Sequence, residues 1–244
     1  MPELPEVETM RRGVEPVVGR RIAKVARTRT KVKPIQITPS MRTFTRRAVG
    51  KKIEATGRVG KRLILHLSGG DRIVIEPRMT GLALLADPPD RGHLRFRMEF
   101  ESPGDSPLLY WDRRGLGLIR LVDSKEFDER YGPEKVGPDA LMISAGDLQS
   151  RLQATRRAVK VALLDQRLTA GVGNLYASEL LHVARIHPAR IGKGLSRLEC
   201  ARIHAATREV LLDAIDHEGS TLSDGTYRNA LNQDGSYQNL HRVY

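Results

Sequence analysis

The stretch KRLILHLSGGDRIVI at residues 61–75 shows how the first half of the chain is expected to fold. Apolar and polar side chains alternate along its first seven residues, as in a strand with one buried face, and SGGD at 68–71 has the composition of a turn. The run RIVI then completes a predicted hairpin. The alternation recurs in HLRFRMEF at 93–100, and LLYWD follows after another turn. Closely spaced strands of this kind predict an antiparallel sandwich or barrel within residues 20–122.

The second half of the chain has helical rather than strand periodicity. A segment with two prolines and two glycines, YGPEKVGPD at 131–139, separates the two regimes and is the best linker candidate. Gly, Ser, Asn and Asp dominate from Gly219 onward and predict polar loops. Between these segments, apolar residues recur at helical spacing in four runs, which span residues 148–152, 159–165, 174–183 and 195–215.

These patterns together predict the α+β fold class. Two further helices are expected in the first half, one beginning near Pro2 and one near Ser40. We therefore predict a β-sandwich domain carrying an N-terminal helix at residues 1–131, a linker at 132–140 and a helical domain at 141–244.

Forty-one lysines and arginines against twenty-nine acidic residues give the chain a formal net charge of +12. A polyanionic partner would suit this surplus, because each phosphate that a cation neutralises releases counterions. The alternative is a solvated basic surface with no nucleic-acid partner. Aromatic residues make up 5% of the chain and form no pattern typical of platforms that stack single strands. Charge thus indicates nucleic acid without indicating a reaction.

Composition excludes several classes of protein. No run of eighteen apolar residues is present, so no membrane span is expected, and the acidic residues at the start are unlike a signal peptide. The single cysteine, Cys200, cannot form an internal disulfide and is most simply a helix-core thiol. His182 and His187 are five residues apart and form no ligand set, so we interpret them as structural. We expect a cytoplasmic, nucleoid-associated monomer.

The N-terminus carries the residues best suited to chemistry. Pro2 directly follows Met1, and a small second residue normally permits removal of the initiator methionine, which would leave a free α-amine on Pro2. An α-amine has a pKa of about 8, against about 10.4 for lysine, so far more of it is neutral at pH 7 and able to attack an aldehyde-like carbon. Glu3 could carry the protons that such an attack requires.

Glu6 and Glu8 complete an acidic cluster that DNA phosphates would repel. One interpretation is a group of catalytic acids. The other is an ordinary helix start, in which acids in the first turn complement the positive end of the helix dipole. The residues alone favour the helix start.

Two motifs resemble the formamidopyrimidine-DNA glycosylase and endonuclease VIII family. MPELPEVE at the N-terminus is similar to the start of that family, and DQRLTAGVGNLYASE at 165–179, followed by IHP at 186–188, is similar to its helix–two-turn–helix. The resemblance extends over essentially the whole chain. It implies that Pro2 is the nucleophile, that Glu3 is the general acid/base, and that Glu6 is a second active-site acid.

The same resemblance implies a set of DNA contacts. Lys61, in the turn GKRL, matches the lysine that contacts the phosphate of the damaged nucleotide, and Asn174 matches the asparagine that holds the same backbone region. An exposed lysine at a strand start is the alternative for Lys61, and Asn174 also suits a helix N-cap. Gly171 and Gly173 would allow a close approach of the backbone because they lack a Cβ, so Gly173 is counted with the DNA-binding residues. Lys160 matches a lysine found near the phosphates.

An enzyme that rotates a base out of the duplex needs side chains to fill the gap that it leaves. Met79, in RMTG, matches the first such wedge of the family. Arg114 and Leu116, in DRRGLG, match the arginine that faces the orphaned base and the aromatic wedge. The formamidopyrimidine type usually has phenylalanine at the latter position, so Leu116 is a departure. A core role is the alternative for both Met79 and Leu116.

The resemblance implies a bifunctional enzyme of base-excision repair. Its substrates would be 8-oxoguanine, formamidopyrimidines or abasic sites in duplex DNA, which would lie in a basic cleft between the two domains under a loop supplied by residues 219–239. Pro2 would form a Schiff base at C1′, after which two eliminations would remove the 3′ and 5′ phosphates. The alternatives are the oxidised-pyrimidine specificity of endonuclease VIII and a non-catalytic DNA-binding relative.

Family members of this type usually continue past the position of Tyr244 into a zinc finger with four cysteines. The chain ends at HRVY with one cysteine far upstream, so no such finger can form within these residues. Either the sequence stops just before the finger, or it belongs to a lineage that dispenses with it. We expect no bound metal and a weaker grip on DNA, and no organic cofactor because the iminium itself accepts the electrons.

Overall fold

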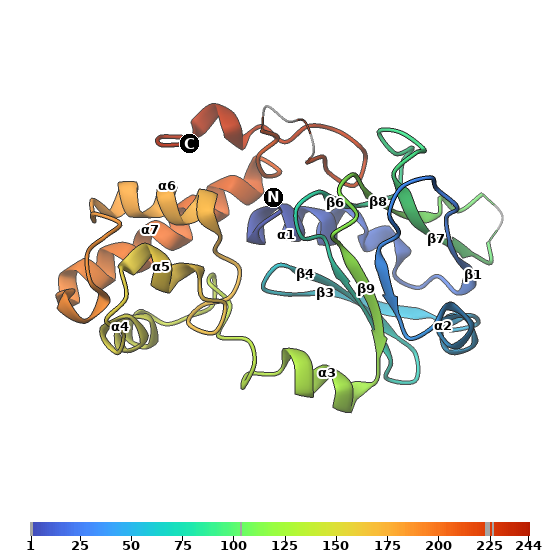
Figure 1. The fold of residues 1–244 in the computed structure, drawn as a ribbon, viewed down its shortest axis with the longest axis horizontal. Coiled ribbons are helices and arrows are strands. Elements are labelled where there is room, and N and C mark those ends of the chain that lie inside the picture. Colours follow the sequence, from blue (N-terminus) through green and yellow to red (C-terminus); the bar gives the residue numbers. More distant parts are fainter. Residues whose placement is uncertain (1, 103, 223–224, 226) are drawn as a thin grey trace.

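The computed structural model describes residues 2–102, 104–222, 225 and 227–244. Figure 1 shows a region of β-sheet and a region of helices, with the first helix at their junction. The helices and helical turns are α1 (Leu4–Gly13), η1 (Glu15–Val17), α2 (Met41–Ala48), α3 (Ser124–Tyr131), α4 (Ala145–Gln153), α5 (Val159–Leu164), α6 (Asn174–Ala184), η2 (Gly192–Gly194), α7 (Arg197–Asp216) and η3 (Tyr237–Leu240). The strands are β1 (Ile22–Arg27), β2 (Gln36–Thr38), β3 (Ile53–Val59), β4 (Arg62–Leu67), β5 (Arg72–Glu76), β6 (Gly81–Leu84), β7 (Leu94–Phe100), β8 (Leu108–Asp112) and β9 (Leu118–Val122).

Two sheets form the first half of the chain. One has four antiparallel strands in the order β1-β7-β8-β6, and the other has five strands in the order β2-β9-β5-β4-β3. Alternation sorts the side chains of β4 onto two faces, since Leu63 and Leu65 belong to the main core whereas Ile64 packs on the outer face with Tyr131 of α3. The strands predicted from alternation are therefore confirmed as β4, β5 and β7.

One pair of strands departs from the predicted antiparallel arrangement. β2 runs parallel to β9, with Gln36 opposite Leu118 and Thr38 opposite Arg120. No tight turn joins these two strands, so the direction in which β2 runs is not fixed by a hairpin. The helix α3 was also not expected; it begins at a capping box in which the side chain of Asp123 accepts a hydrogen bond from the backbone N–H of Glu126.

The second half contains the helices that the apolar spacing predicts. The four predicted runs correspond to α4, α5, α6 and α7, which confirms the change from strand to helix periodicity. Tyr176 and Leu180 of α6 pack into one core with Ile203 and Leu211 of α7. Within the described part of the chain, no helix combines the length and apolar character needed to cross a membrane.

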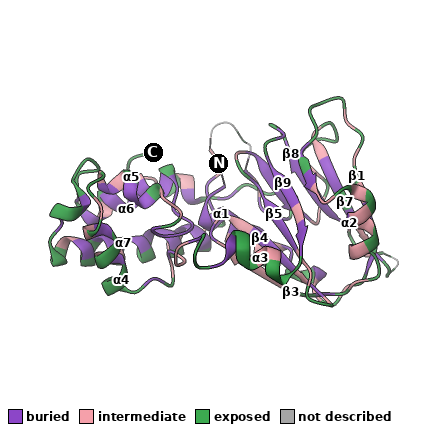
Figure 2. Cartoon of the chain, turned by 60° about the horizontal axis from the view of Figure 1, so that its bottom comes forward, coloured by how far each residue is buried: buried purple, intermediate pink, exposed green. Residues whose placement is uncertain are grey.

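At the junction, each half of the chain buries some of its side chains in the core of the other half. Leu4, at the start of α1, is buried in the core of the helical region, and its backbone N–H donates to the carbonyl of Gly171 at 3.0 Å. Conversely, Tyr227 and Ala230, from the segment after α7, are buried in the core of the sheet region. Figure 2 shows α1 as a largely buried element between the two regions. The first turn of α1 is thus held from both sides.

Candidate active site

Pro2 lies in the wall of a cavity of about 240 Å³ at the junction of the two regions. Lys61 reaches the same cavity because it occupies the tip of the β3–β4 hairpin. Met1, whose removal would free the amine of Pro2, lies outside the described residues. The lining residues come from four segments of the chain and are Pro2, Lys61, Arg62, Glu76, Arg78, Leu164 and Gln166.

The carboxylate of Glu3 is buried against the N-terminus of α6. Its oxygens accept hydrogen bonds from the backbone N–H groups of Gly173 at 2.6 Å and Leu175 at 3.0 Å. Burial raises the pKa of Glu3 to about 7, and the negative charge of Glu6 adds to this effect, whereas Lys61 and the two N–H donors oppose it. A carboxyl group with this pKa can both give and take a proton near neutral pH.

Lys61 is half-buried. Burial lowers the pKa of its ammonium group, while Glu3 and Glu6 act in the opposite direction. The alternative of an exposed lysine at a strand start is therefore wrong for Lys61, and its contact with a DNA phosphate stays a prediction.

Glu6 connects three segments instead of facing solvent. One oxygen accepts hydrogen bonds from the hydroxyl of Tyr176 at 2.5 Å and the backbone N–H of Ser220 at 3.0 Å. The other accepts from the backbone N–H of Glu3 at 2.8 Å. Glu6 therefore fixes the backbone of Glu3 relative to α6 and to the segment after α7.

Two glycines permit the close packing between α1 and the start of α6. A Cβ on Gly171, where φ is 111°, would overlap the side chain of Leu4, and a Cβ on Gly173 would overlap both the carboxyl group of Glu3 and the Nζ of Lys61. Both glycines therefore lie where a Cβ would clash with neighbouring side chains of the protein. A direct contact between Gly173 and DNA stays a prediction.

Asn174 does not serve as the helix N-cap. Gly173 occupies that position, and Asn174 is the first residue of α6. The N-cap interpretation of Asn174 is therefore wrong, and the carboxylate of Glu3 accepts from the backbone N–H groups of Gly173 and Leu175 at this helix start. The side-chain amide of Asn174 instead donates to the hydroxyl of Tyr244 at 2.9 Å.

Gly173→Ala is expected to reduce the free energy of unfolding by about 1–3 kcal/mol, because the added methyl group must displace Glu3 or Lys61. Urea unfolding measures this change. Gly194→Ala is the matched control, since a Cβ at Gly194 meets no atom within 4 Å, and it is expected to change stability by less than about 0.5 kcal/mol. Equal effects of the two substitutions would contradict the packing at Gly173.

Two loops that are hydrogen-bonded to each other carry three of the predicted residues. Met79 lies in the loop before β6, and Arg114 and Leu116 lie in the loop after β8. The hydroxyl of Thr80 donates to Asp112 at 2.5 Å and accepts from the backbone N–H of Arg114 at 2.9 Å. Leu116 is 45% exposed, so the alternative of a core role is wrong for this residue. Met79 is half-buried and Arg114 is exposed. Their roles as wedge residues stay predictions.

Arg95, which no motif of the sequence marks, holds the loop of Arg114 in place. Arg95 is 2% exposed, and its guanidinium donates to the carbonyl oxygens of Asp112 at 2.7 Å and Lys33 at 3.1 Å. It lies beside Phe96 in β7, where strict alternation would place one of the two in solvent. The sequence alternates regularly here and therefore gave no signal; the departure appears only in the structure, where the pairing of β7 with β8 shifts register between Leu94 and Phe96.

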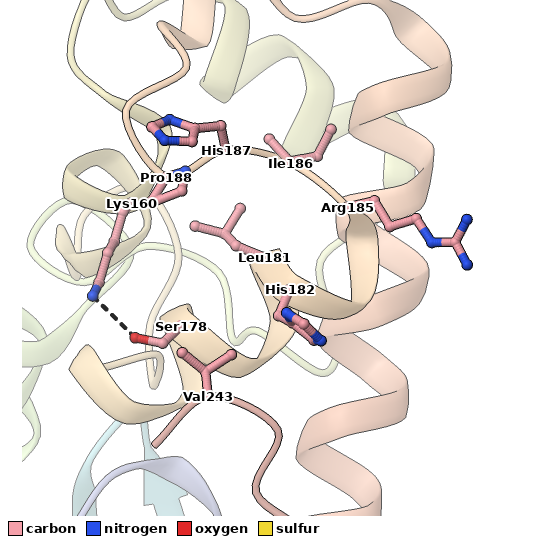
Figure 3. A pocket seen from close by; sticks show the side chains of 9 residues that line it. All are labelled: Lys160, Ser178, Leu181, His182, Arg185, Ile186, His187, Pro188 and Val243. Atoms are coloured by element: carbon pink, nitrogen blue, oxygen red, sulfur yellow. Dashed lines mark hydrogen bonds between the residues drawn. The ribbon is translucent and has the colours of Figure 1, made fainter.

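Lys160 lies on a different cavity, of about 510 Å³, in the helical region. Figure 3 shows its Nζ directed at Ser178, to which it donates a hydrogen bond of 3.0 Å. His182 and His187 line the same cavity, together with Val243. The structure therefore does not bring Lys160 to the cavity of Pro2, and its contact with phosphates stays a prediction.

Glu179 is a further residue with a structural role that its place in the sequence does not indicate. Its carboxylate is fully buried on α6 and accepts hydrogen bonds from three consecutive backbone N–H groups, those of Arg242 at 2.9 Å and of Val243 and Tyr244 at 3.0 Å each. Three N–H donors compensate the burial of this acid. Glu179 thereby holds residues 242–244 beside the start of α6, where Tyr244 meets Asn174.

The described residues include no set that fits a structural zinc site. Cys200 is buried in the core of α7, and the described residues contain no group of three or more His, Cys, Asp or Glu side chains arranged to hold a metal ion. A zinc finger requires four such ligands on one ion.

The structure thus sorts the predicted site residues into three places. Those brought together at the junction are Pro2, Glu3, Glu6, Lys61 and Gly173. Asn174 follows Gly173 in the chain, but its side chain is exposed and contacts Tyr244. The pair of hydrogen-bonded loops carries Met79, Arg114 and Leu116, and the helical cavity carries Lys160.

Comparison with known proteins adds an independent line of evidence. Residues 1–119 match the family model for the formamidopyrimidine-DNA glycosylase N-terminal domain, and residues 136–226 match the model for the H2TH domain of the same enzyme. The formamidopyrimidine-DNA glycosylase of Chloroflexus aurantiacus is 37% identical over 250 residues, which cover 100% of this chain and 86% of the relative.

Solved structures agree with these matches. The MutM (Fpg) protein from Thermus thermophilus superposes with a TM-score of 0.85 at 36% identity, covering 100% of this chain and 87% of that protein. A mutant of the Lactococcus lactis enzyme, in complex with DNA that contains Fapy-dG, superposes with a TM-score of 0.87 at 31% identity, covering 100% and 88%. The chain therefore belongs to the formamidopyrimidine-DNA glycosylase family.

Proposed function

We propose that this DNA glycosylase is bifunctional: it excises oxidised purines from duplex DNA and then cleaves the strand through a Schiff base on Pro2. The observation that supports this most directly is the arrangement around Pro2. A cavity with Pro2 and Lys61 in its wall lies next to a buried carboxyl group, Glu3, whose pKa is raised to about 7. A nucleophilic amine and a proton carrier at one site are what the reaction requires.

The first step joins the enzyme to the sugar. The neutral nitrogen of Pro2 attacks C1′, the damaged base leaves with the electrons of the glycosidic bond, and the proton that the nitrogen of Pro2 then loses is taken up by the departing base. Glu3, partly protonated near neutral pH, donates a proton to O4′ as the sugar ring opens. The product is an iminium between Pro2 and C1′. Glu6 acts as a positioning residue in this step, because it holds the backbone of Glu3.

The following steps cleave the strand by elimination. The iminium acidifies C2′, and loss of a C2′ proton sends its electrons toward the iminium nitrogen and then expels the 3′ phosphate. Loss of a C4′ proton in the same conjugated system expels the 5′ phosphate. The iminium accepts the electrons throughout, so we propose that neither a metal nor an organic cofactor takes part in this chemistry.

Duplex DNA is the partner that the charge and the relatives support. The chain carries a formal net charge of +12, and the related Lactococcus lactis protein was crystallised on DNA that contains Fapy-dG. We propose 8-oxoguanine and formamidopyrimidines as the excised bases. Rotation of the damaged nucleotide toward Pro2 would leave a gap for Met79, Leu116 and Arg114, which lie on one pair of hydrogen-bonded loops.

Borohydride trapping on a duplex with a single lesion tests the proposed function. A covalent adduct between the protein and an 8-oxoguanine duplex, formed equally well with a chelator present, is the expected result. Tight binding without an adduct would indicate a non-catalytic DNA-binding relative. An adduct with oxidised-pyrimidine duplexes but none with oxidised purines would indicate the specificity of endonuclease VIII.

Lys61→Ala is expected to weaken binding to a lesion duplex and to reduce the slope of log K against log salt by about one, because one phosphate contact is lost. Asn174→Ala should weaken binding at an unchanged slope, since a neutral amide displaces no counterion. Lys24→Ala, in the exposed part of β1, is the control and should leave both quantities unchanged. If the salt slope of Lys61→Ala equals that of the parent protein, Lys61 does not bind a phosphate.

A further inference from the structure

A buried carboxylate at the end of β5 is surrounded by more positive charge than it neutralises. Glu76 is 5% exposed, and its oxygens lie 2.8 Å from Arg120, 3.1 Å from Arg78 and 3.6 Å from Arg62. The hydroxyl of Tyr131 donates to the same carboxylate at 3.1 Å. Three guanidinium groups share one negative charge, so the cluster keeps a surplus of two positive charges.

Two of these three arginines face the cavity of Pro2. Arg62 and Arg78 line it together with Lys61, whereas Arg120 is engaged by Glu76 and by the hydroxyl of Tyr131. The side chain of Arg78 is 54% exposed and that of Arg62 is 22% exposed. The surplus charge is therefore presented to solvent mainly by Arg78.

The backbone at Arg78 adds a second, independent observation. Its φ is 57°, in the left-handed region where a side chain costs conformational energy and glycine does not. Core packing does not account for an arginine here, because more than half of its side chain is exposed. A strained residue with an exposed charge beside a reactive site points to a functional role.

We propose that Arg78 binds a backbone phosphate of the strand whose damaged nucleotide enters the Pro2 cavity. Glu76 restrains the guanidinium through one edge, and the exposed remainder is free to form charge-assisted hydrogen bonds with the phosphate oxygens. The next residue along the chain is Met79, so the same backbone conformation fixes a phosphate contact and a predicted wedge. This inference rests on the proposed position of DNA over the Pro2 cavity.

An ion pair with Glu76 is the competing explanation for Arg78. Only the arginine of this pair is exposed, and Glu76 keeps Arg62 and Arg120 as partners when Arg78 is removed. Loss of the pair does not alter how many counterions DNA binding releases. A phosphate contact does alter that number. The dependence of binding on salt therefore separates the two explanations, whereas a loss of stability does not.

Arg78→Gly is the decisive variant, because glycine removes the charge and also relieves the left-handed backbone. Binding is measured across a range of salt concentrations on a duplex with a tetrahydrofuran abasic-site analogue, which cannot form a Schiff base. We expect binding about tenfold weaker or more near 0.1 M salt, a salt slope reduced by about one, and a Tm at or above that of the parent protein. Arg78→Lys keeps the charge and should keep the parental slope.

Arg21→Ala is the matched control. Arg21 has 53% side-chain exposure and pairs with Glu101 at 3.6 Å, and it precedes β1, at the opposite edge of the four-stranded sheet from β6. Its slope should equal that of the parent. The phosphate contact would be overturned if the salt slope of Arg78→Gly equalled that of the parent protein. It would also be overturned if Arg78→Gly and Arg21→Ala reduced the salt slope by the same amount. Because the analogue reports binding alone, this outcome is independent of whether Pro2 is the nucleophile.

Discussion

An N-terminal extension that turns the amine of Pro2 into an amide is expected to abolish the borohydride-trapped adduct while leaving DNA binding nearly unchanged. The nitrogen of an amide has no available lone pair, so it cannot attack C1′. Pro2→Gly keeps an α-amine but loses the ring that lines the cavity, so it should still form the adduct at a reduced rate. Single-turnover trapping on an 8-oxoguanine duplex measures both effects.

The same tag placed at the C-terminus controls for added bulk and should leave the rate of adduct formation at the level of the untagged protein. Binding of all variants to the tetrahydrofuran duplex shows whether each still recognises DNA. If the N-terminally extended protein forms the adduct at the parental rate, then another residue is the nucleophile, and Lys61, in the wall of the same cavity, becomes the next candidate.

The fold could be predicted wherever one element buries one face. The helical spacing in α7 follows from a single buried side and needs no knowledge of the partner. In β4 the alternation of Leu63, Leu65 and Leu67 marks the face toward the main core, although the opposite face is also covered at Ile64. β2 has three residues, too few to show a period, and its parallel pairing with β9 depends on the path of the whole chain. α3 escaped detection for a related reason, since Tyr131 is the only buried residue among its eight.

Only those residues of the candidate site that lie within a recognisable motif could be predicted from the sequence. The resemblance named Pro2 and Lys61, but it did not indicate that Glu3 caps α6 across 170 residues of sequence. It also gave no sign of the cluster at Glu76, because the arginines come from three separate segments and each resembles an ordinary surface cation. Long-range pairings of buried charges have no local pattern in the sequence.

Glu3→Gln is expected to change the stability of the protein in a pH-dependent way. The pKa of Glu3 is about 7 in the folded protein against a usual 4.5, so the folded state holds this proton more tightly than the unfolded chain does. The contribution of Glu3 to stability therefore falls as pH rises from about 4.5 to about 7, by an amount on the order of 3 kcal/mol. Glutamine does not titrate, so the stability of the variant does not fall between pH 4.5 and 7 for this reason.

The Tm of Glu3→Gln, relative to that of the parent, should accordingly rise between pH 4.5 and 7 and level off above about pH 8. Glutamine has one acceptor oxygen for the two N–H donors of Gly173 and Leu175, so the variant also carries a constant penalty that shifts the whole curve without changing its slope. The rate of adduct formation should fall by about 10²–10⁴, since the proton carrier is lost. Thermal unfolding and trapping across this pH range measure both quantities, with Glu134→Gln, in the exposed linker, as the control for the loss of one charge. A difference in Tm that stays flat between pH 4.5 and 7 would mean that Glu3 titrates normally in the folded protein, and its role as a proton carrier near neutral pH would then lose its physical basis.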